Sequence, residues 1–366
     1  MKIINELATS LNQQFNWNKS RMNCFVRMLI GLISVRSVNL QEIATAFDSR
    51  SQISSRYRRI QRFFAFFEID LAHLSLWLYQ LFFQPADKVY VVIDRTNWYV
   101  GKKKINIFML SVAYEGLAIP ICWHLLNKAG SSSFEEQKCL LNEFIGRFGI
   151  GRIEGILGDR EFMNHRLLSW LNKQNVAYYL RIKEGTQLYI RGRKWWSAKK
   201  CFRHLKMKEQ CIFNMAVEIG KNKVFLAGSR SCRGELMIVV TNRHPKNAIA
   251  IYLRRWEVEN LFQNLKGRGF RFEETHLTKQ ERISKLMALL AVGFAWAHKV
   301  GEWTALKKPI LFKKFRTEQR PQNSFFRLGL DVLRDCFFHA NFKKTELKQA
   351  IKLILPMSFC HGEAIL

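Results

Sequence analysis

Two short apolar segments, each followed at once by an aspartate, constrain this sequence most. "KVYVVID" (88–94) ends on Asp94, and "RIEGILGD" (152–159) ends on Asp159. Runs of this length and β-branched composition are typical of strands buried in the centre of a sheet. A single aspartate after a strand is about as often only a turn or cap residue. Because an ionised carboxylate beside a core is costly to hold without a cation or hydrogen bonds, two such aspartates indicate a functional site.

The segments around these aspartates predict an ordered succession of strands and helices. A hairpin of strands over 105–126 follows the first aspartate, and a helix with a serine cap covers 132–149. A helix at 163–175 and a strand at 176–183 follow the second aspartate. The order β, β, β, α, β, α, β resembles that of a ribonuclease H-like domain, so the expected fold class is α/β. In that order a last helix should carry a third acid.

The segment 186–240 delays this last helix. It alternates and turns like a small β-domain, which predicts a β-rich insertion within the catalytic core. The helix then follows as "YLRRWEVENLFQNLKGRGF" (252–270), and it carries polar side chains that return to one face at the ~3.6-residue helical period. These side chains are Tyr252, Arg255, Glu259 and Lys266.

Three carboxylates, from Asp94, Asp159 and Glu259, are the candidate catalytic and metal-binding groups. Clustered carboxylates repel one another, and hard divalent cations with oxygen ligands supply the opposite charge; Mg²⁺ also keeps waters and binds substrate phosphate. Two such ions ~3.5–4 Å apart can activate an attacking oxygen on one side of a phosphorus and stabilise the leaving oxygen on the other. We therefore expect two Mg²⁺ ions, for which Mn²⁺ can substitute. Asp94 would bridge both ions, and each of the other acids would complete one site.

The charge of the chain indicates an anionic partner. Lys and Arg number 59 against 29 Asp and Glu, which leaves a formal charge of +30; nucleic acid and acidic membrane surfaces are the usual candidates. The apolar runs are shorter than the ~20 residues of a membrane span, and the N-terminus has no apolar signal core. We therefore expect nucleic acid as the partner, no membrane, and a cytoplasmic location.

The cysteine pattern fits that location. Eight cysteines are scattered without a Cys-x2-Cys pair, as expected for free thiols. A zinc site is the weaker alternative for one group, because its spacing matches no common zinc finger. The group is Cys201, His204, Cys211 and Cys232.

Candidate DNA contacts occur in two regions. The segments 39–47 and 51–67 predict two helices that resemble a helix-turn-helix reader, although a solvated basic face fits the second helix nearly as well. The arginines of that second helix are Arg56, Arg58, Arg59 and Arg62. Near the acids, the residues predicted to contact DNA phosphate or bases are Tyr252, Arg255, Lys266, Arg160 and Asn97.

The sequence resembles the insertion-sequence 4 family of bacterial DDE transposases, over about residues 20–330. The family signature Tyr-x2-Arg-x3-Glu-x6-Lys is present without a change in spacing as Tyr252, Arg255, Glu259 and Lys266. The blocks that look like family neighbourhoods are "DRTNW" (94–98), "GDREF" (158–162) and "GRGFRFEETHL" (267–277).

The resemblance implies cut-and-paste transposition. A homodimer pairs the two terminal inverted repeats, each active site nicks one strand, and the freed 3′-OH forms a hairpin that water opens before joining to target DNA. The insertion would shield the hairpin. Some relatives also flip a base onto a tryptophan of the insertion, where Trp195 and Trp196 are the only candidates and lie early; packing is the open alternative.

The predicted domain organisation has five parts. A helical DNA-end-binding domain (1–86) precedes the first part of the core (87–185), the β-rich insertion (186–240), the second part of the core with the Glu helix (241–310) and a basic helical C-terminal region for dimerisation (311–366). Two alternatives remain: a non-catalytic DNA-binding protein, against which the three acids argue, and a ribonuclease H-like nuclease without strand joining, which would not need the N-terminal helices or the insertion.

Overall fold

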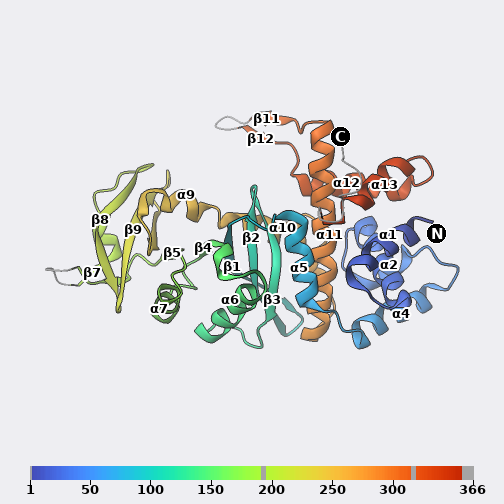
Figure 1. Ribbon diagram of the computed structural model, residues 1–366, viewed down its shortest axis with the longest axis horizontal. Helices are drawn as coiled ribbons and strands as arrows, with labels where there is room; N and C mark the ends of the chain where they lie inside the picture. The colour runs from blue at the N-terminus through green and yellow to red at the C-terminus, as the bar shows by residue number, and fades with distance from the viewer. Residues whose placement is uncertain (1, 191–194, 315–318, 357–366) are drawn as a thin grey trace. The chain divides into compact units, whose positions relative to one another are not determined.

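The structure, a computed structural model, describes residues 2–190, 195–314 and 319–356 (Figure 1). Its described residues fall into two compact units. The sheet unit comprises Ala86–Asn97 and Asn106–Leu261, and the helical unit comprises the described parts of 1–85, 98–105 and 262–366.

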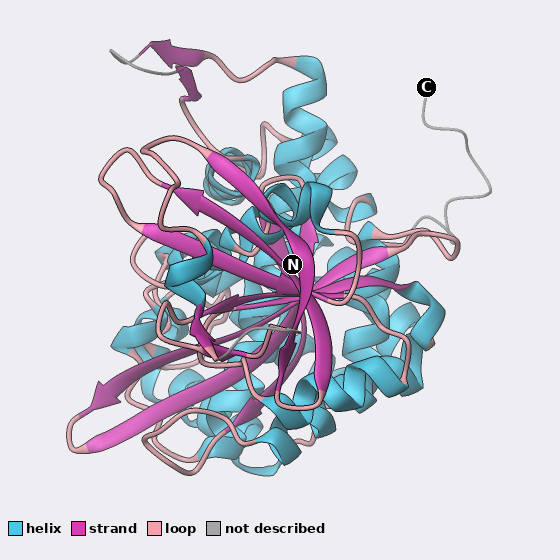
Figure 2. Cartoon of the chain, turned by 90° about the vertical axis from the view of Figure 1, so that its left-hand side faces the viewer, coloured by secondary structure: helices cyan, strands magenta, loops and turns pink. Residues whose placement is uncertain are grey.

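The sheet unit is built on one eight-stranded mixed sheet with the order β3-β2-β1-β4-β5-β10-β9-β8. Its strands are β1 (Val89–Val100), β2 (Lys103–Tyr114), β3 (Leu117–Leu125), β4 (Ile153–Gly158), β5 (Tyr178–Ile182), β8 (Gln210–Ile219), β9 (Asn222–Arg230) and β10 (Leu236–Thr241). Strands β1, β4 and β5 run parallel, whereas β2–β3, β5–β10, β10–β9 and β9–β8 are antiparallel. Figure 2 shows the strands fanning apart, as the twist of a large sheet requires. The predicted α/β class, with a sheet consistent with a ribonuclease H-like domain, is confirmed.

Local signals that the sequence carries account for several of these elements. The β2–β3 hairpin turns at Glu115 (φ 44°) and Gly116 (φ 86°), two positive φ values that suit a tight two-residue turn. Helix α6 (Phe134–Phe148) begins with a capping box between Ser133 and Glu136 and ends at Gly149. The predicted hairpin and the serine-capped helix are therefore confirmed.

The sheet unit also holds the helices α7 (His165–Lys173), α8 (Ala198–Cys201) and α9 (Ala248–Leu253), together with the 3₁₀ turns Ile150–Arg152 and Pro245–Asn247. The boundary between the units falls within α10 (Trp256–Leu265), after Leu261. Helix α6 packs against β3 and α7, while α9 packs against β5, β9 and β10. Figure 1 shows α6 and α7 along one side of the strands and α9 along the other.

Two expectations about the strands need correction. Strand β1 continues to Val100, so Asp94 lies inside a strand and not at its end; pairing with β4 stops at Ile93, but β2 still flanks β1. Strands β8, β9 and β10 do not form a separate small β-domain. They extend the central sheet, because β10 pairs with the backbone groups of β5 that would otherwise be an exposed sheet edge. A short pair, β6 (Gln187–Leu188) with β7 (Trp196–Ser197), lies in the same segment.

The single helix predicted over 252–270 is also wrong. Helix α9 ends at Leu253 and α10 begins at Trp256, with Arg254 and Arg255 between them. The backbone N–H groups of Arg254, Arg255 and Glu257 donate to carbonyls three residues earlier, a tighter pattern than the α-helical one. The signature residues therefore do not share one continuous helix.

The helical unit gathers N-terminal and C-terminal helices around one long core helix. Its elements are α1 (Lys2–Phe15), α2 (Lys19–Val35), α3 (Leu40–Thr45), α4 (Ile53–Phe66), α5 (Leu71–Phe82), the 3₁₀ turn Phe272–Glu274, α11 (Gln280–Lys307), β11 (Phe312–Lys314), β12 (Gln319–Pro321), α12 (Phe325–Phe338) and α13 (Lys344–Lys352). Helix α11 contacts α2, α4, α5 and α12. Among the described residues it is the one helix long and apolar enough to cross a membrane, but 89% of its apolar window is buried, as in a core helix.

Two glycines permit the close crossing of α11 and α12. A Cβ on Gly301 would lie 1.8 Å from the carbonyl oxygen of Phe325, and a Cβ on Gly329 would lie 1.8 Å from that of Ala297. The backbones of the two helices therefore touch directly. The C-terminal region is helical as predicted in α12 and α13, whereas β11 and β12 pair as antiparallel strands where helix was expected.

Candidate active site

The pairing of β1 with β4 brings the two aspartates together. The parallel register runs from Val91 opposite Ile156 to Ile93 opposite Gly158. Asp94 is the next residue of β1 and Asp159 directly follows β4, so the two aspartates lie at the same level of the sheet. The Asp94 side chain is 16% exposed, and one oxygen of Asp159, Oδ1, is buried without a hydrogen bond.

Arg255 connects Asp94 to the third acid. Its Nη1 donates to Asp94 Oδ2 at 3.1 Å and its Nη2 to Glu259 Oε1 at 2.5 Å, and its side chain is only 6% exposed. Glu259, the fourth residue of α10, is half exposed. The oxygens of the three acids do not all lie within 4.8 Å of one another, because the guanidinium group occupies the space between two of them.

Burial controls the electrostatics of this group. It raises the pKa of Asp94 from 3.8 to about 6, and the nearby Glu161 and Asp159 add to this rise, against the opposing effect of Arg255 and of the Arg95 backbone N–H. Burial lowers the pKa of Arg255, whereas Tyr252 and the carboxylates of Asp94 and Glu259 raise it by more. The net shift of this pKa is therefore upward. Arg255 therefore remains a cation.

The residues present fit a divalent cation. When all three acids are ionised, the Arg255 guanidinium that joins two of them leaves two negative charges, and the buried Asp159 Oδ1 has no hydrogen bond. The donors are all carboxylate oxygens, which suit Mg²⁺ and similar hard ions. Such a metal, when bound, supplies Lewis-acid stabilisation of charge on the oxygens of a phosphodiester.

Residues 85–293, more than half of the chain, match the family described as Transposase DDE domain. The chain belongs to this family of transposases. It is a metal-dependent polynucleotidyl transferase and endonuclease that acts on DNA by cleavage and strand transfer. A comparison with curated proteins found no match.

A partly buried ion pair, which sequence reasoning missed, joins the two aspartate-bearing segments of the transposase. Arg95, next to Asp94, donates from Nε and Nη2 to the two oxygens of Glu161, each at 2.7 Å, and Glu161 lies two residues after Asp159. Arg95 Nη1 also donates to Asn106 Oδ1 and to the Gly130 carbonyl. Both residues stand within the blocks "DRTNW" and "GDREF", but only the parallel pairing of β1 with β4 shows that they meet.

Tyr252, which the sequence predicted to contact DNA, is buried in this structure. It is 1% exposed and its hydroxyl is buried without a hydrogen bond, while the Arg255 guanidinium lies 5.8 Å from its ring centroid. Burial raises the pKa of the Tyr252 hydroxyl. The Tyr252 ring therefore packs beside the Arg255 guanidinium. Arg255 itself binds two carboxylates, whereas the sequence predicted a contact with phosphate.

The other residues predicted near the acids have different surroundings. Lys266 belongs to the helical unit, where its Nζ lies 2.7 Å from Glu273 and 5.5 Å from the Trp98 ring centroid. Arg160 is about half exposed, with Nε 3.9 Å from Asp159 Oδ1, and Asn97 is exposed. Arg160 and Asn97 are therefore accessible to a ligand.

The four arginines of α4 divide into two pairs. Arg56 donates to the carbonyls of Ser51 and Ser49, and Arg59 donates to the carbonyl of Ser20, so both serve the fold. Arg58 and Arg62 are exposed. Arg58 and Arg62 are therefore the α4 arginines whose side chains are accessible to DNA.

The insertion contains two tryptophans proposed for base flipping and a group of possible zinc ligands, and these residues make only some of the predicted contacts. Trp195 is 58% exposed and lies 5.6 Å from the Tyr189 ring, and Trp196 stacks with Lys200, so neither is a core residue. Residues 191–194 lie outside the described part of the chain. In the zinc alternative, only His204 and Cys211 approach each other, at 3.8 Å, and this group is not among the potential metal sites of the described residues.

Proposed function

We propose that this transposase belongs to the insertion-sequence 4 family, with Asp94, Asp159 and Glu259 as the ligands of two Mg²⁺ ions that Mn²⁺ can replace. The observation that carries the proposal is the register of β1 and β4, which sets Asp94 beside Asp159 while Arg255 holds Glu259 next to Asp94. The undisturbed spacing of the Tyr, Arg, Glu and Lys signature supports the subfamily.

Arg255 contacts two of the three proposed metal ligands. Glu259 is half exposed and stands on the first turn of a helix, so its side chain can turn from the guanidinium to a metal ion. Arg255 is buried and would stay on Asp94. The guanidinium would then neutralise charge beside the metals while Glu259 completes the second site.

The DNA steps are those that the resemblance to the insertion-sequence 4 family implies. The transposase would bind the terminal inverted repeats through the exposed Arg58 and Arg62 of α4, and a homodimer would pair the two ends before cleavage in the bacterial cytoplasm. Strand transfer would proceed through a DNA hairpin at the transposon end. The segment 186–240 would cover this hairpin. The basic excess of the chain, +30, supports an extended DNA interface.

A strand-joining assay tests the proposal. A radiolabelled duplex of the element's terminal repeat with a free 3′-OH, incubated with supercoiled plasmid and Mg²⁺, should become covalently attached to the plasmid. Glu259→Gln should bind the duplex equally and yield no joined product. Cleavage of uncut ends without any joining would instead favour a nuclease, and a labelled hairpin on a denaturing gel would report the second-strand route.

A further inference from the structure

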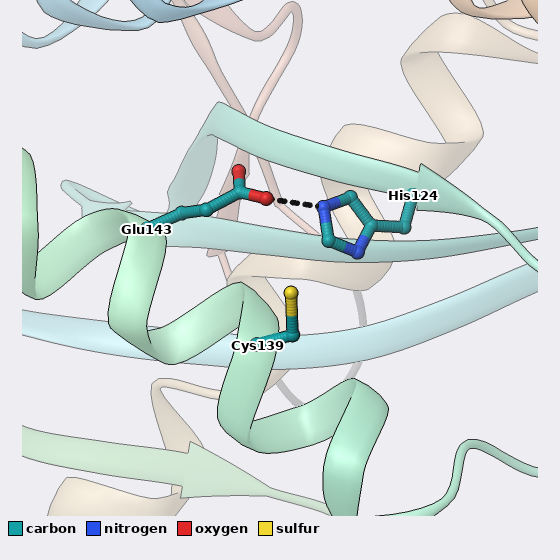
Figure 3. A group of neighbouring side chains, drawn as sticks. All are labelled: His124, Cys139 and Glu143. Carbon is teal, nitrogen blue, oxygen red and sulfur yellow. Dashed lines mark hydrogen bonds and ion pairs between the residues drawn. The ribbon is translucent and has the colours of Figure 1, made fainter.

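A second cluster of potential metal ligands lies in the sheet unit, on elements that carry none of the three acids. His124 is near the end of β3, and Cys139 and Glu143 are four residues apart on α6. One ligand atom from each lies within 4.8 Å of the others. Figure 3 shows the Cys139 thiol pointing toward the gap between the His124 ring and the Glu143 carboxylate.

The cluster is held in position and open to solvent. His124 Nε2 and Glu143 Oε1 lie 2.6 Å apart, and their side chains are 29% and 33% exposed, while Cys139 is exposed. Arg147 supports Glu143 at 3.5 Å and donates to the sulfur of Cys122 on β3. Helix α6 packs against β3, so both ligand-bearing elements belong to one packed layer.

The donor chemistry selects a transition metal over Mg²⁺. Thiolate and imidazole ligands suit Zn²⁺, whereas magnesium prefers oxygen. Ligand atoms about 2.0–2.3 Å from a tetrahedral zinc lie roughly 3.5 Å from one another. Here all the ligand atoms lie within 4.8 Å and the pair of His124 and Glu143 is 2.6 Å apart, so small side-chain rotations reach the zinc spacing. One thiolate and one carboxylate also balance the charge of a divalent ion.

We propose that His124, Cys139 and Glu143 form a Zn²⁺ site, separate from the carboxylate site of the transposition reaction, that ties α6 to β3. On binding, the S–H bond of Cys139 breaks, its proton passes to solvent and a sulfur–zinc bond forms, with no change of oxidation state. Three protein ligands leave a coordination position for water. The site does not depend on the assignment of the catalytic acids.

Cobalt titration of the whole protein tests this site. After treatment with a chelator and its removal, addition of Co²⁺ should produce a thiolate-to-metal charge-transfer band that saturates at one ion per chain, and Zn²⁺ should displace it. Cys139→Ser should abolish the band. The matched controls Cys232→Ser and Cys211→Ser remove cysteines outside the cluster, the latter beside His204, and should leave it intact.

Two further variants separate this site from other sources of the signal. His124→Ala and Glu143→Gln should each weaken Co²⁺ binding at least about tenfold, the scale seen when a supporting group of a metal site is lost. Glu259→Gln should leave the band and the affinity unchanged. No band at stoichiometric Co²⁺, or a band that persists in Cys139→Ser, would overturn the proposal and leave a His124–Glu143 ion pair beside an unconnected thiol.

Discussion

The guanidinium of Arg255 donates to the carboxylate of Asp94 at 3.1 Å, although 161 residues separate them in the sequence. Both side chains are largely buried, and the same guanidinium also binds Glu259. One cation thus holds two of the three proposed metal ligands.

Removing the negative charge from any of the three acids should abolish cleavage and leave DNA binding intact. For Asp94→Asn, Asp159→Asn and Glu259→Gln, we expect single-turnover cleavage of a terminal-repeat duplex to fall about a thousandfold or more, the order seen for essential catalytic groups. Glu154→Gln, an exposed acid at the other end of β4, is the matched control and should cleave normally. Cleavage retained in one acid variant would exclude that residue from the site.

Arg255→Gln should destabilise the metal-free sheet unit. Breaking a buried ion pair costs about 3–5 kcal/mol, and the lower end is expected here because Glu259 is half exposed. Divalent metal should restore more stability to the variant than to the wild type, since two carboxylates lose their cation. Thermal unfolding with and without Mn²⁺ measures both effects.

The control for this measurement is Arg327→Gln. Arg327 also pairs with an acid four residues away, Asp331, but both side chains are 42% exposed. Exposed pairs contribute at most about 1 kcal/mol. Equal losses in the two variants would show that burial of Arg255 has no energetic consequence.

Arg95→Lys should raise the metal concentration needed for half-maximal cleavage. Lysine keeps the charge but cannot form two parallel hydrogen bonds to Glu161, so the two segments that carry Asp94 and Asp159 lose a common support. We expect a shift of about 10–100-fold, as for residues that orient metal ligands, with DNA affinity unchanged.

The matched substitution for Arg95 is Arg166→Lys, because Arg166 pairs with Glu135 on the surface. It should leave the metal dependence as in the wild type. A fall in maximal rate for Arg95→Lys at saturating metal, without any change in the half-maximal concentration, would contradict a role in orienting the metal ligands.

The raised pKa of Asp94 predicts the pH dependence of metal binding. Since burial raises that pKa from 3.8 to about 6, the carboxyl contributes most to the stability of the metal-free fold below pH 3.8, and this contribution is lost as pH rises through about 6. Metal requires the ionised form. The affinity for Mn²⁺ should therefore fall about tenfold per pH unit below pH 6 and level off above it. Calorimetric titration at several pH values checks this, and an affinity that does not change across pH 6 would contradict it.

The exposed arginines of α4 should contribute to DNA affinity. Arg58→Ala and Arg62→Ala should each weaken binding and reduce the slope of log affinity against log salt by about 0.9, one released counterion each. Arg56→Ala, which removes bonds to the carbonyls of Ser49 and Ser51, should lower the melting temperature instead. An unchanged salt slope for both exposed variants would return α4 to a solvated basic face.

Much of the architecture could be predicted from local sequence patterns. The capping box at Ser133, the Asn39 cap of α3 and the Glu115-Gly116 turn each depend on a few neighbouring residues, so their elements appear where expected. The apolar runs before Asp94 and Asp159 likewise predict two buried strands, which β1 and β4 confirm.

Local sequence patterns do not predict which distant segments of the chain pair with one another. Strand β10 joins the central sheet through β5, and helix 252–270 breaks at Arg254 and Arg255. Neither outcome follows from the periodicity of the sequence. The pairing of β10 depends on which sheet edge it reaches, and the helix break depends on the buried acid that Arg255 contacts.

The sequence by itself determined the residue types of the candidate site: three acids, a signature arginine and a strongly basic chain. Only the tertiary structure decided their relations. The parallel register sets Asp94 beside Asp159, and burial turns Arg255 from a predicted phosphate contact into a bridge between carboxylates. The physical reason is that periodicity and caps act over one or two helical turns, whereas register, burial and charge balance depend on surfaces that form only when distant segments pack.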